Sequence, residues 1–237
     1  MTNAQALPVV TPYLLRRADD MCPRRLALTY DDSDGTQGAF TRYRIRYPLL
    51  DAARNAHAEL RPPDPQFFTP PADLLPDEQK LFRRVSETYC RVFAGEPVRT
   101  ILGHPGERRT ESKRLGVMVG GAVDLLVEDP DGGRELRQFE LWGRDVCADP
   151  AESWETLLAV LRLVGFLGDV VLRVRHVDLV HGKTDERLVD LARNRAGIVR
   201  RFEERLELVR SRADKDSPEE GQDCGTCPYI PLCGVHW

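Results

Sequence analysis

The chain has 237 residues, of which 41% are hydrophobic and 30% are charged, and its formal net charge is -4. This length and apolar content suffice for one sizeable core, and the acidic balance is unlike that of dedicated DNA-binding proteins, which are usually basic overall. No apolar run approaches the roughly 20 residues that a membrane helix requires, and the N-terminus lacks a secretory leader pattern. We therefore expect a protein of the cytoplasm that makes no membrane contact.

The N-terminal third is predicted to contain a hairpin, a helix and an irregular segment that crosses the protein surface. Two extended-looking stretches, LALTY (26–30) and RYRIRY (42–47), flank a turn-rich segment and predict a β-hairpin. A helix is expected over 49–60. The prolines of 61–76 exclude regular helix there and indicate a surface crossing.

The next elements alternate between helix and strand. Apolar residues recur at helical spacing from 77 to 94, which predicts an amphipathic helix with Cys90 in its core. Strand patterns at 117–129 and 135–146 surround a DPDGG turn. A buried helix over 153–168, a strand over 169–182 and a charged helix over 185–212 complete an α/β pattern.

The C-terminal tail carries the most specific pattern. Cys224, Cys227 and Cys233 form C-x2-C-x5-C, and Cys22 at the opposite end of the chain offers a fourth thiolate. Thiols stay reduced in the cytoplasm, so this set favours an iron–sulfur cluster that joins both termini. Zinc remains an alternative, with His236 as a conceivable further ligand, whereas Cys147 has no partner at metal-site spacing.

Both ends of the chain resemble a known family. VTPYLLRRADDMCPRRLALTY and DCGTCPYIPLC are similar to the opening and closing strips of the PD-(D/E)XK nuclease superfamily, in its RecB/AddB-like and CRISPR-associated exonuclease branch with a four-cysteine 4Fe-4S cluster. The resemblance implies one domain over 1–237, with a restriction-endonuclease-like core: a central mixed sheet flanked by helices. Residues 1–47 and 213–237 would form its cluster-binding end.

The same resemblance implies a metal-dependent phosphodiester centre. The family places a histidine on an early helix, an aspartate after a glycine, and a Glu-x-Lys on the next strand; His57, Asp124 and Glu140 match in order and spacing. Such carboxylates suit Mg²⁺ or Mn²⁺. The structural alternatives are a helix-core histidine, a solvated aspartate and a Glu140–arginine ion pair.

The lysine of the family motif is replaced by Trp142. Arg144, two residues further along the same strand face, could stabilise charge but could not act as a base. Lys113 is a second candidate replacement. Trp142 could instead stack on unpaired bases, with Arg108 and Arg109 contacting phosphates, unless it simply fills the core.

Two main functions remain open from the sequence. The first is a degenerate DNA-binding or scaffold subunit, acting on single-stranded DNA beside a helicase or another nuclease subunit. The second is an active metal-dependent DNA exonuclease of repair, recombination or defence. An iron–sulfur redox or sensor protein without a DNA role is a third interpretation.

Overall fold

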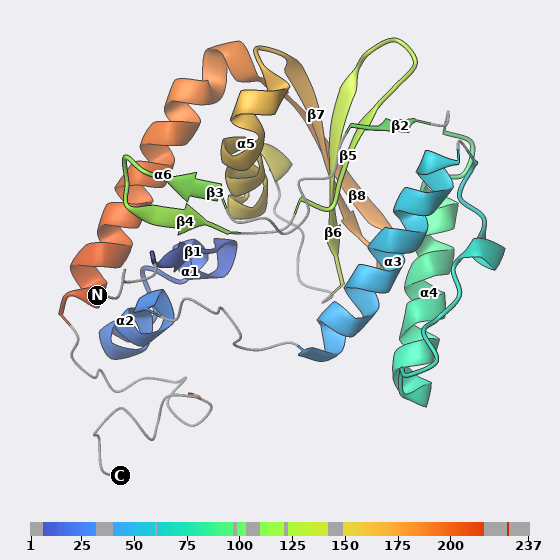
Figure 1. Ribbon diagram of the computed structural model, residues 1–237, viewed down its shortest axis with the longest axis horizontal. Helices are drawn as coiled ribbons and strands as arrows, with labels where there is room; N and C mark the ends of the chain where they lie inside the picture. The colour runs from blue at the N-terminus through green and yellow to red at the C-terminus, as the bar shows by residue number, and fades with distance from the viewer. Residues whose placement is uncertain are drawn as a thin grey trace, which may run out of the picture.

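The fold is of the α/β class. The computed structural model describes residues 7–31, 40–59, 61–96, 99–102, 110–120, 123–141, 149–215 and 227. Within these ranges, helices flank a five-stranded mixed sheet, and a three-stranded sheet lies beside it (Figure 1). The mixed sheet flanked by helices that the sequence predicts is thus confirmed, although its elements differ in part from those expected.

The larger sheet has the strand order β2-β5-β6-β7-β8. Its strands are β2 (Thr100–Ile101), β5 (Leu125–Glu128), β6 (Arg134–Glu140), β7 (Val171–Asp178) and β8 (Lys183–Asp190). The first three run antiparallel in succession, and β7 then pairs parallel to β6 after a helical crossover, as a parallel pair requires. As a result, the carboxyl ends of β6 and β7 lie side by side.

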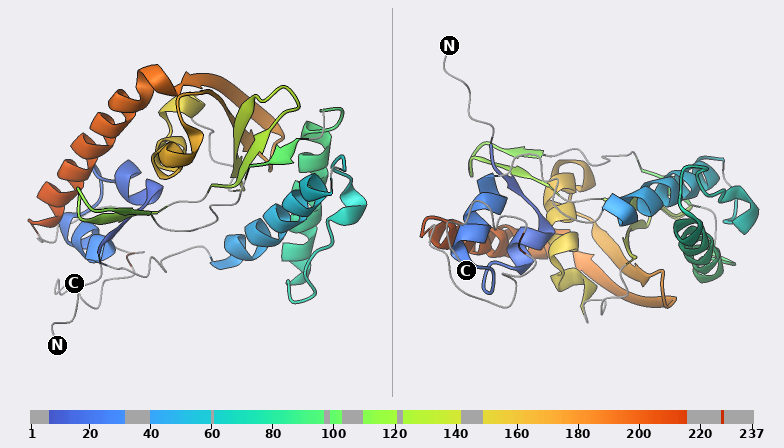
Figure 2. Two further views of the ribbon diagram at one scale, coloured as in Figure 1. Left: turned by 45° about the horizontal axis from the view of Figure 1, so that its top comes forward. Right: turned by 90° about the horizontal axis from the view of Figure 1, so that it is seen from below.

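Four long helices cover the two faces of this sheet. They are α3 (Phe40–Ala58), α4 (Pro76–Val92), α5 (Trp154–Leu167) and α6 (Leu191–Ala213). Side chains of β6 alternate between faces: Phe139 packs with residues of α3 and α4, whereas Leu136 packs with residues of α5 and α6. Figure 2 shows these helices and the sheet from two further directions.

The smaller sheet has the order β1-β4-β3 and is held by the first and last helices. It comprises β1 (Val9–Val10), β3 (Thr110–Ser112) and β4 (Val117–Val119), next to α1 (Pro12–Arg16) and α2 (Pro23–Asp31). Leu14 and Leu26 share a core with Phe202 and Leu206 of α6. The first and last helical segments of the described chain are therefore packed together.

The predicted hairpin over 26–47 is wrong, because both stretches are helical, in α2 and α3. RYRIRY alternates like a strand, but Ile45, Leu49 and Ala53 are buried at four-residue steps, and this longer helical period prevails. The helix predicted over 185–212 is wrong at its start, where β8 runs to Asp190. The Asp190 side chain then accepts a hydrogen bond from the Arg193 N–H at 3.2 Å and caps α6.

Other predicted elements are confirmed. The helices expected over 77–94 and 153–168 are α4 and α5, and the strand expected over 169–182 is β7. Cys90 is buried as expected. The pattern over 117–129 divides between β4 and β5, and Gly120 lies so close to β1 that an added Cβ would come within 3.0 Å of Val9. Segment 61–75 contains one short 3₁₀ helix, η1 (Pro65–Phe67), as its only regular element.

Candidate functional site

Asp124 lies directly before β5, and its carboxylate is bound by an arginine from α3. Arg46 Nη2 lies 2.6 Å from Oδ1 and 2.7 Å from Oδ2, and Arg46 Nε lies 3.2 Å from Oδ1. Asp124 is buried, and the side chain of Arg46 is only 12% exposed. The guanidinium thus supplies the positive charge that balances this carboxylate.

Arg46 also connects Asp124 to β6. The backbone N–H of Phe139 donates to Asp124 Oδ2 at 2.7 Å, and Arg46 Nη1 donates to the Phe139 carbonyl at 3.1 Å. About two turns further along α3, Arg54 donates to the carbonyl of Asp124 at 3.3 Å. Both oxygens of Asp124 therefore already accept hydrogen bonds, so the carboxylate as it stands does not fit a metal ion.

Glu140 is half-buried at the end of β6, one residue beyond Phe139. It is in register with Asp178 of β7, and its carbonyl accepts a hydrogen bond from the Leu179 N–H at 3.0 Å. Because β5 and β6 pair antiparallel, Asp124, directly before β5, and Glu140, at the end of β6, lie toward the same end of this strand pair.

Asp178 is buried at the end of β7 and holds the turn that follows. Its Oδ2 accepts from His181 Nδ1 at 2.5 Å, and its Oδ1 accepts from the backbone N–H groups of Val180 and His181. Burial favours the neutral acid, but these hydrogen bonds outweigh it and hold the pKa of Asp178 below its ordinary value. The carboxylate therefore stays ionised and fixes the imidazole of His181.

A further histidine lies beneath the start of α5. His176 is in register with Gln138, and its Nε2 lies 2.9 Å from Thr156 Oγ1 and 3.2 Å from Ser153 Oγ. Burial lowers the pKa of His176, although the charges of Glu155, Asp124 and Asp185 oppose the shift. Sequence reasoning missed Arg46, His176 and Asp178. The last two are polar residues two positions apart in the strand predicted over 169–182, and that spacing was the available signal.

His57 lies on α3, but the structure does not bring it to Asp124. Its Nδ1 donates to the carbonyl of Arg99 at 3.1 Å, so Nε2 is the acceptor for the hydroxyl of Tyr89 at 3.2 Å. Burial raises the pKa of Tyr89 to about 12, which keeps that hydroxyl protonated. Both ring nitrogens are engaged, and metal ligation by His57, which stays a prediction, would require Tyr89 to release Nε2.

Acid is expected to destabilise the fold through His57. Burial, followed by the nearby charge of Arg137, lowers the pKa of His57 to about 4. The unfolded chain takes up this proton near pH 6.5, so the loss begins below about pH 6.5, is complete below about pH 4, and reaches about 3 kcal/mol. Urea unfolding between pH 7 and pH 4 should therefore give a flatter stability profile for His57→Gln than for the wild type. Parallel profiles would contradict this assignment.

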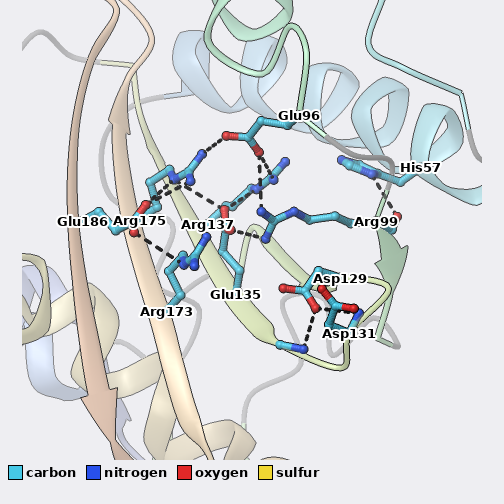
Figure 3. A network of polar contacts seen from close by, with 11 residues as sticks. His57, Glu96, Arg99, Asp129, Asp131, Glu135, Arg137, Arg173, Arg175 and Glu186 are labelled. Carbon is cyan, nitrogen blue, oxygen red and sulfur yellow. Dashed lines mark hydrogen bonds and ion pairs between the residues drawn. The ribbon is translucent and has the colours of Figure 1, made fainter.

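A buried network of charged residues lies beside His57 (Figure 3). Glu135 accepts from Arg99 and from Arg137 Nε, the latter at 2.6 Å. Glu96, which follows α4, accepts from Arg137 Nη2 at 2.8 Å and from Arg175. Three guanidinium groups thus share two carboxylates, and the network ties the end of α4 to β6 and β7.

The candidate cluster ligands lie partly within the described chain. Cys22 directly precedes α2, and its carbonyl accepts the first hydrogen bond of that helix from Leu26. Cys22 and Cys227 are both half-buried. Cys224 and Cys233 lie outside the described residues, as do Arg108, Arg109, Trp142, Arg144, Cys147 and His236.

The end of α6 lies beside Cys22. Arg212 Nη2 donates to the Met21 carbonyl at 2.8 Å, and Arg205 Nε donates to the Leu15 carbonyl at 2.6 Å. The eleven residues from Ala213 to Cys224 span up to roughly 36–40 Å when extended. This length of chain is enough for the C-terminal cysteines to reach Cys22.

Other expected features are absent from the site or from the described ranges. Lys113 lies in the exposed turn after β3, in the smaller sheet, and not beside Asp124. In the part of the chain that the structure describes, no group of three or more His, Cys, Asp or Glu side chains is arranged to hold a metal ion.

None of the described helices is long and apolar enough to cross a membrane.

Comparisons with known proteins identify no family. No protein-family model matches the chain, and no curated protein matches it. Among solved structures, the chain is similar to one described as "Crystal structure of SSO0001", with 13% sequence identity, 94% of each chain covered and a TM-score of 0.33.

Proposed function

We propose that this protein is an iron–sulfur-containing DNA-binding subunit of the PD-(D/E)XK nuclease type. In this proposal its centre is degenerate, and it acts as a scaffold for DNA beside a helicase or an active nuclease. The cluster is a 4Fe-4S centre held by Cys22, Cys224, Cys227 and Cys233.

The order of the candidate residues supports the nuclease-type assignment. His57 lies on the helix that precedes the sheet, Asp124 begins β5, and Glu140 ends the neighbouring strand β6. That is the order of helix and strands in which the resemblance places a histidine and two carboxylates. The coarse architecture, a mixed sheet between helices, is compatible with it.

The ion pair between Arg46 and Asp124 is the observation that favours a degenerate centre over an active one. A guanidinium stays protonated at any physiological pH, so it occupies the carboxylate permanently unless the helix moves. A divalent cation would have to displace a buried, bidentate partner and the Phe139 N–H together. Removing one partner of such a pair typically costs about 3–5 kcal/mol, which a weakly bound Mg²⁺ does not supply.

The packing of α6 supports the cluster. When bound, the cluster would supply a covalent connection between the two ends of the chain, and the residues present already hold those ends together. Arg212 of α6 donates to the carbonyl of Met21, the residue before Cys22, and Met21 and Ala213 share one core. A cluster there therefore binds to ends that are prearranged.

The test is DNA binding and cleavage by the anaerobically purified protein. Fluorescein-labelled single-stranded DNA should bind in an anisotropy assay and remain uncut with Mn²⁺, because Asp124 is not available as a ligand. The matched variants are Asp124→Asn, which removes the charge, and Asp51→Asn, which removes an exposed charge from α3. Cleavage that Asp124→Asn abolishes and Asp51→Asn retains would establish an active exonuclease instead. A protein that neither binds nor cuts DNA would contradict the DNA-binding role.

A further inference from the structure

Four exposed basic side chains gather where α4 meets the turn between β7 and β8. They are Arg84, Arg91, His181 and Lys183, and we call this set the basic patch. Arg84 Nη2 donates to the Val180 carbonyl at 3.1 Å, and Arg91 Nη2 lies 3.0 Å from where a Cβ on Gly182 would be. The two arginines therefore flank the turn. Figure 2 shows the end of the β7–β8 hairpin reaching α4.

Ion pairing distinguishes the basic patch from many arginines of the described chain. Guanidinium groups elsewhere, such as those of Arg44, Arg46 and Arg175, pair with carboxylates. Among the residues that the structure describes, Arg84, Arg91 and Lys183 form no ion pair. Because an unpaired cluster of like charges is unfavourable in the free protein, it is the type of surface that a polyanion stabilises.

Few acidic groups face the basic patch. Glu87 lies on the exposed side of α4 between the two arginines, and Asp178 is buried beneath His181. Asp178 fixes the ring of His181 through Nδ1, which leaves the exposed edge of the imidazole toward solvent. The net charge of the basic patch together with these two carboxylates is therefore positive at neutral pH.

The basic patch lies next to the candidate centre. Asp178 is in register with Glu140, and the Leu179 N–H donates to the Glu140 carbonyl. The turn that carries His181 thus begins one residue beyond the position beside Glu140. A polymer lying on α4 and this turn would pass the carboxyl ends of β6 and β7.

We propose that the basic patch holds the sugar–phosphate backbone of DNA next to the candidate centre. This inference rests on the proposed function, since it names the surface through which that DNA is held. Arg84 and Arg91 are seven residues apart on one helix face, about 10 Å along the axis, so they contact different phosphates. Arginine suits this role because its planar fork pairs with phosphate oxygens in bidentate fashion.

The experiment measures how affinity for labelled single-stranded DNA depends on salt. The test variant combines Arg84→Gln, Arg91→Gln and Lys183→Gln. The control combines Arg193→Gln and Arg200→Gln, which are exposed on α6, with Lys215→Gln, two residues beyond that helix. Both variants lose three positive charges, and in both the two helical arginines are replaced by glutamine, a good helix former. The test variant should bind about tenfold or more weakly, and its slope of log K against log salt should be shallower by about 2.

Glu87→Gln provides a change in the opposite direction. Removing this carboxylate from between the two arginines should tighten binding several-fold, which misfolding cannot explain. If the two triple variants have equal affinities and slopes while the wild type still binds, DNA does not bind at the basic patch. The proposed function would still stand. Failure of the wild type to bind any DNA would overturn both. If the Tm of the test variant alone is lowered, the single variant Arg84→Lys provides the check. It keeps the positive charge and must bind DNA about as tightly as the wild type if charge is what matters.

Discussion

Replacing Glu135 by Ala is expected to lower the free energy of unfolding by about 3–5 kcal/mol. Glu135 is fully buried and accepts from Arg99 and Arg137, whose side chains are also buried (Figure 3). The truncation leaves two guanidinium groups in the interior with one carboxylate fewer to balance them. Glu96 cannot compensate, because it already receives Arg137 and Arg175.

Urea unfolding of Glu135→Ala at pH 7 measures this loss. The control is Lys80→Ala, which breaks an exposed ion pair with Asp77 on α4 and should change stability by less than about 1 kcal/mol. A Glu135→Ala protein as stable as Lys80→Ala would show that water or rearrangement compensates the arginines, and that the network is not what ties α4 to the sheet.

Replacing Cys227 by Ser is expected to remove the brown colour of the anaerobically purified protein and to destabilise it. In the proposed arrangement, the cluster closes a loop of some two hundred residues between Cys22 and Cys224. By the chain-entropy estimate used for disulfides, opening such a loop costs about 5 kcal/mol. The fold would then depend on α6 alone to hold the two ends together.

An absorption spectrum with iron and zinc analysis tests this prediction. The control is Cys90→Ala, which removes a buried thiol of α4 whose pKa burial raises to about 12. This variant should lose stability through packing but keep its iron. A colourless wild type, a zinc-containing wild type, or a Cys227→Ser protein that retains its iron would each contradict the cluster assignment.

Much of the fold follows from local periodicity in the sequence. The helices α4 and α5 were predictable because their apolar residues recur at three- and four-residue steps, and β7 because its branched residues form a continuous strand pattern. Residues 42–47 were wrongly predicted to form a strand because arginine alternates there with tyrosine and isoleucine at every second position. Their partners, Asp73 for Arg44 and Asp124 for Arg46, lie far along the chain, so this pattern reflects tertiary ion pairs and not a strand.

The candidate site was less predictable than the fold. Asp124 and Glu140 could be proposed from the resemblance, and the pairing of β5 with β6 from the tendency of strands that are neighbours in sequence to be neighbours in space. The partner of Asp124 could not, because Arg46 comes from a helix 78 residues earlier and nothing local distinguishes it from Arg42 or Arg44. Pairing with an arginine, which the sequence suggests as the structural alternative for Glu140, is therefore found at Asp124.

The contacts of the N-terminal segment determine when it can fold during synthesis. β1 pairs with β4, more than a hundred residues later, and α1 and α2 pack against α6 near the other end of the chain. Contacts at such sequence separation form late, since the intervening chain must first be ordered. As the polypeptide leaves the ribosome, residues 7–31 must therefore wait with an exposed apolar face until α6 emerges. A chain truncated before α6 should consequently aggregate, even though its larger sheet is complete.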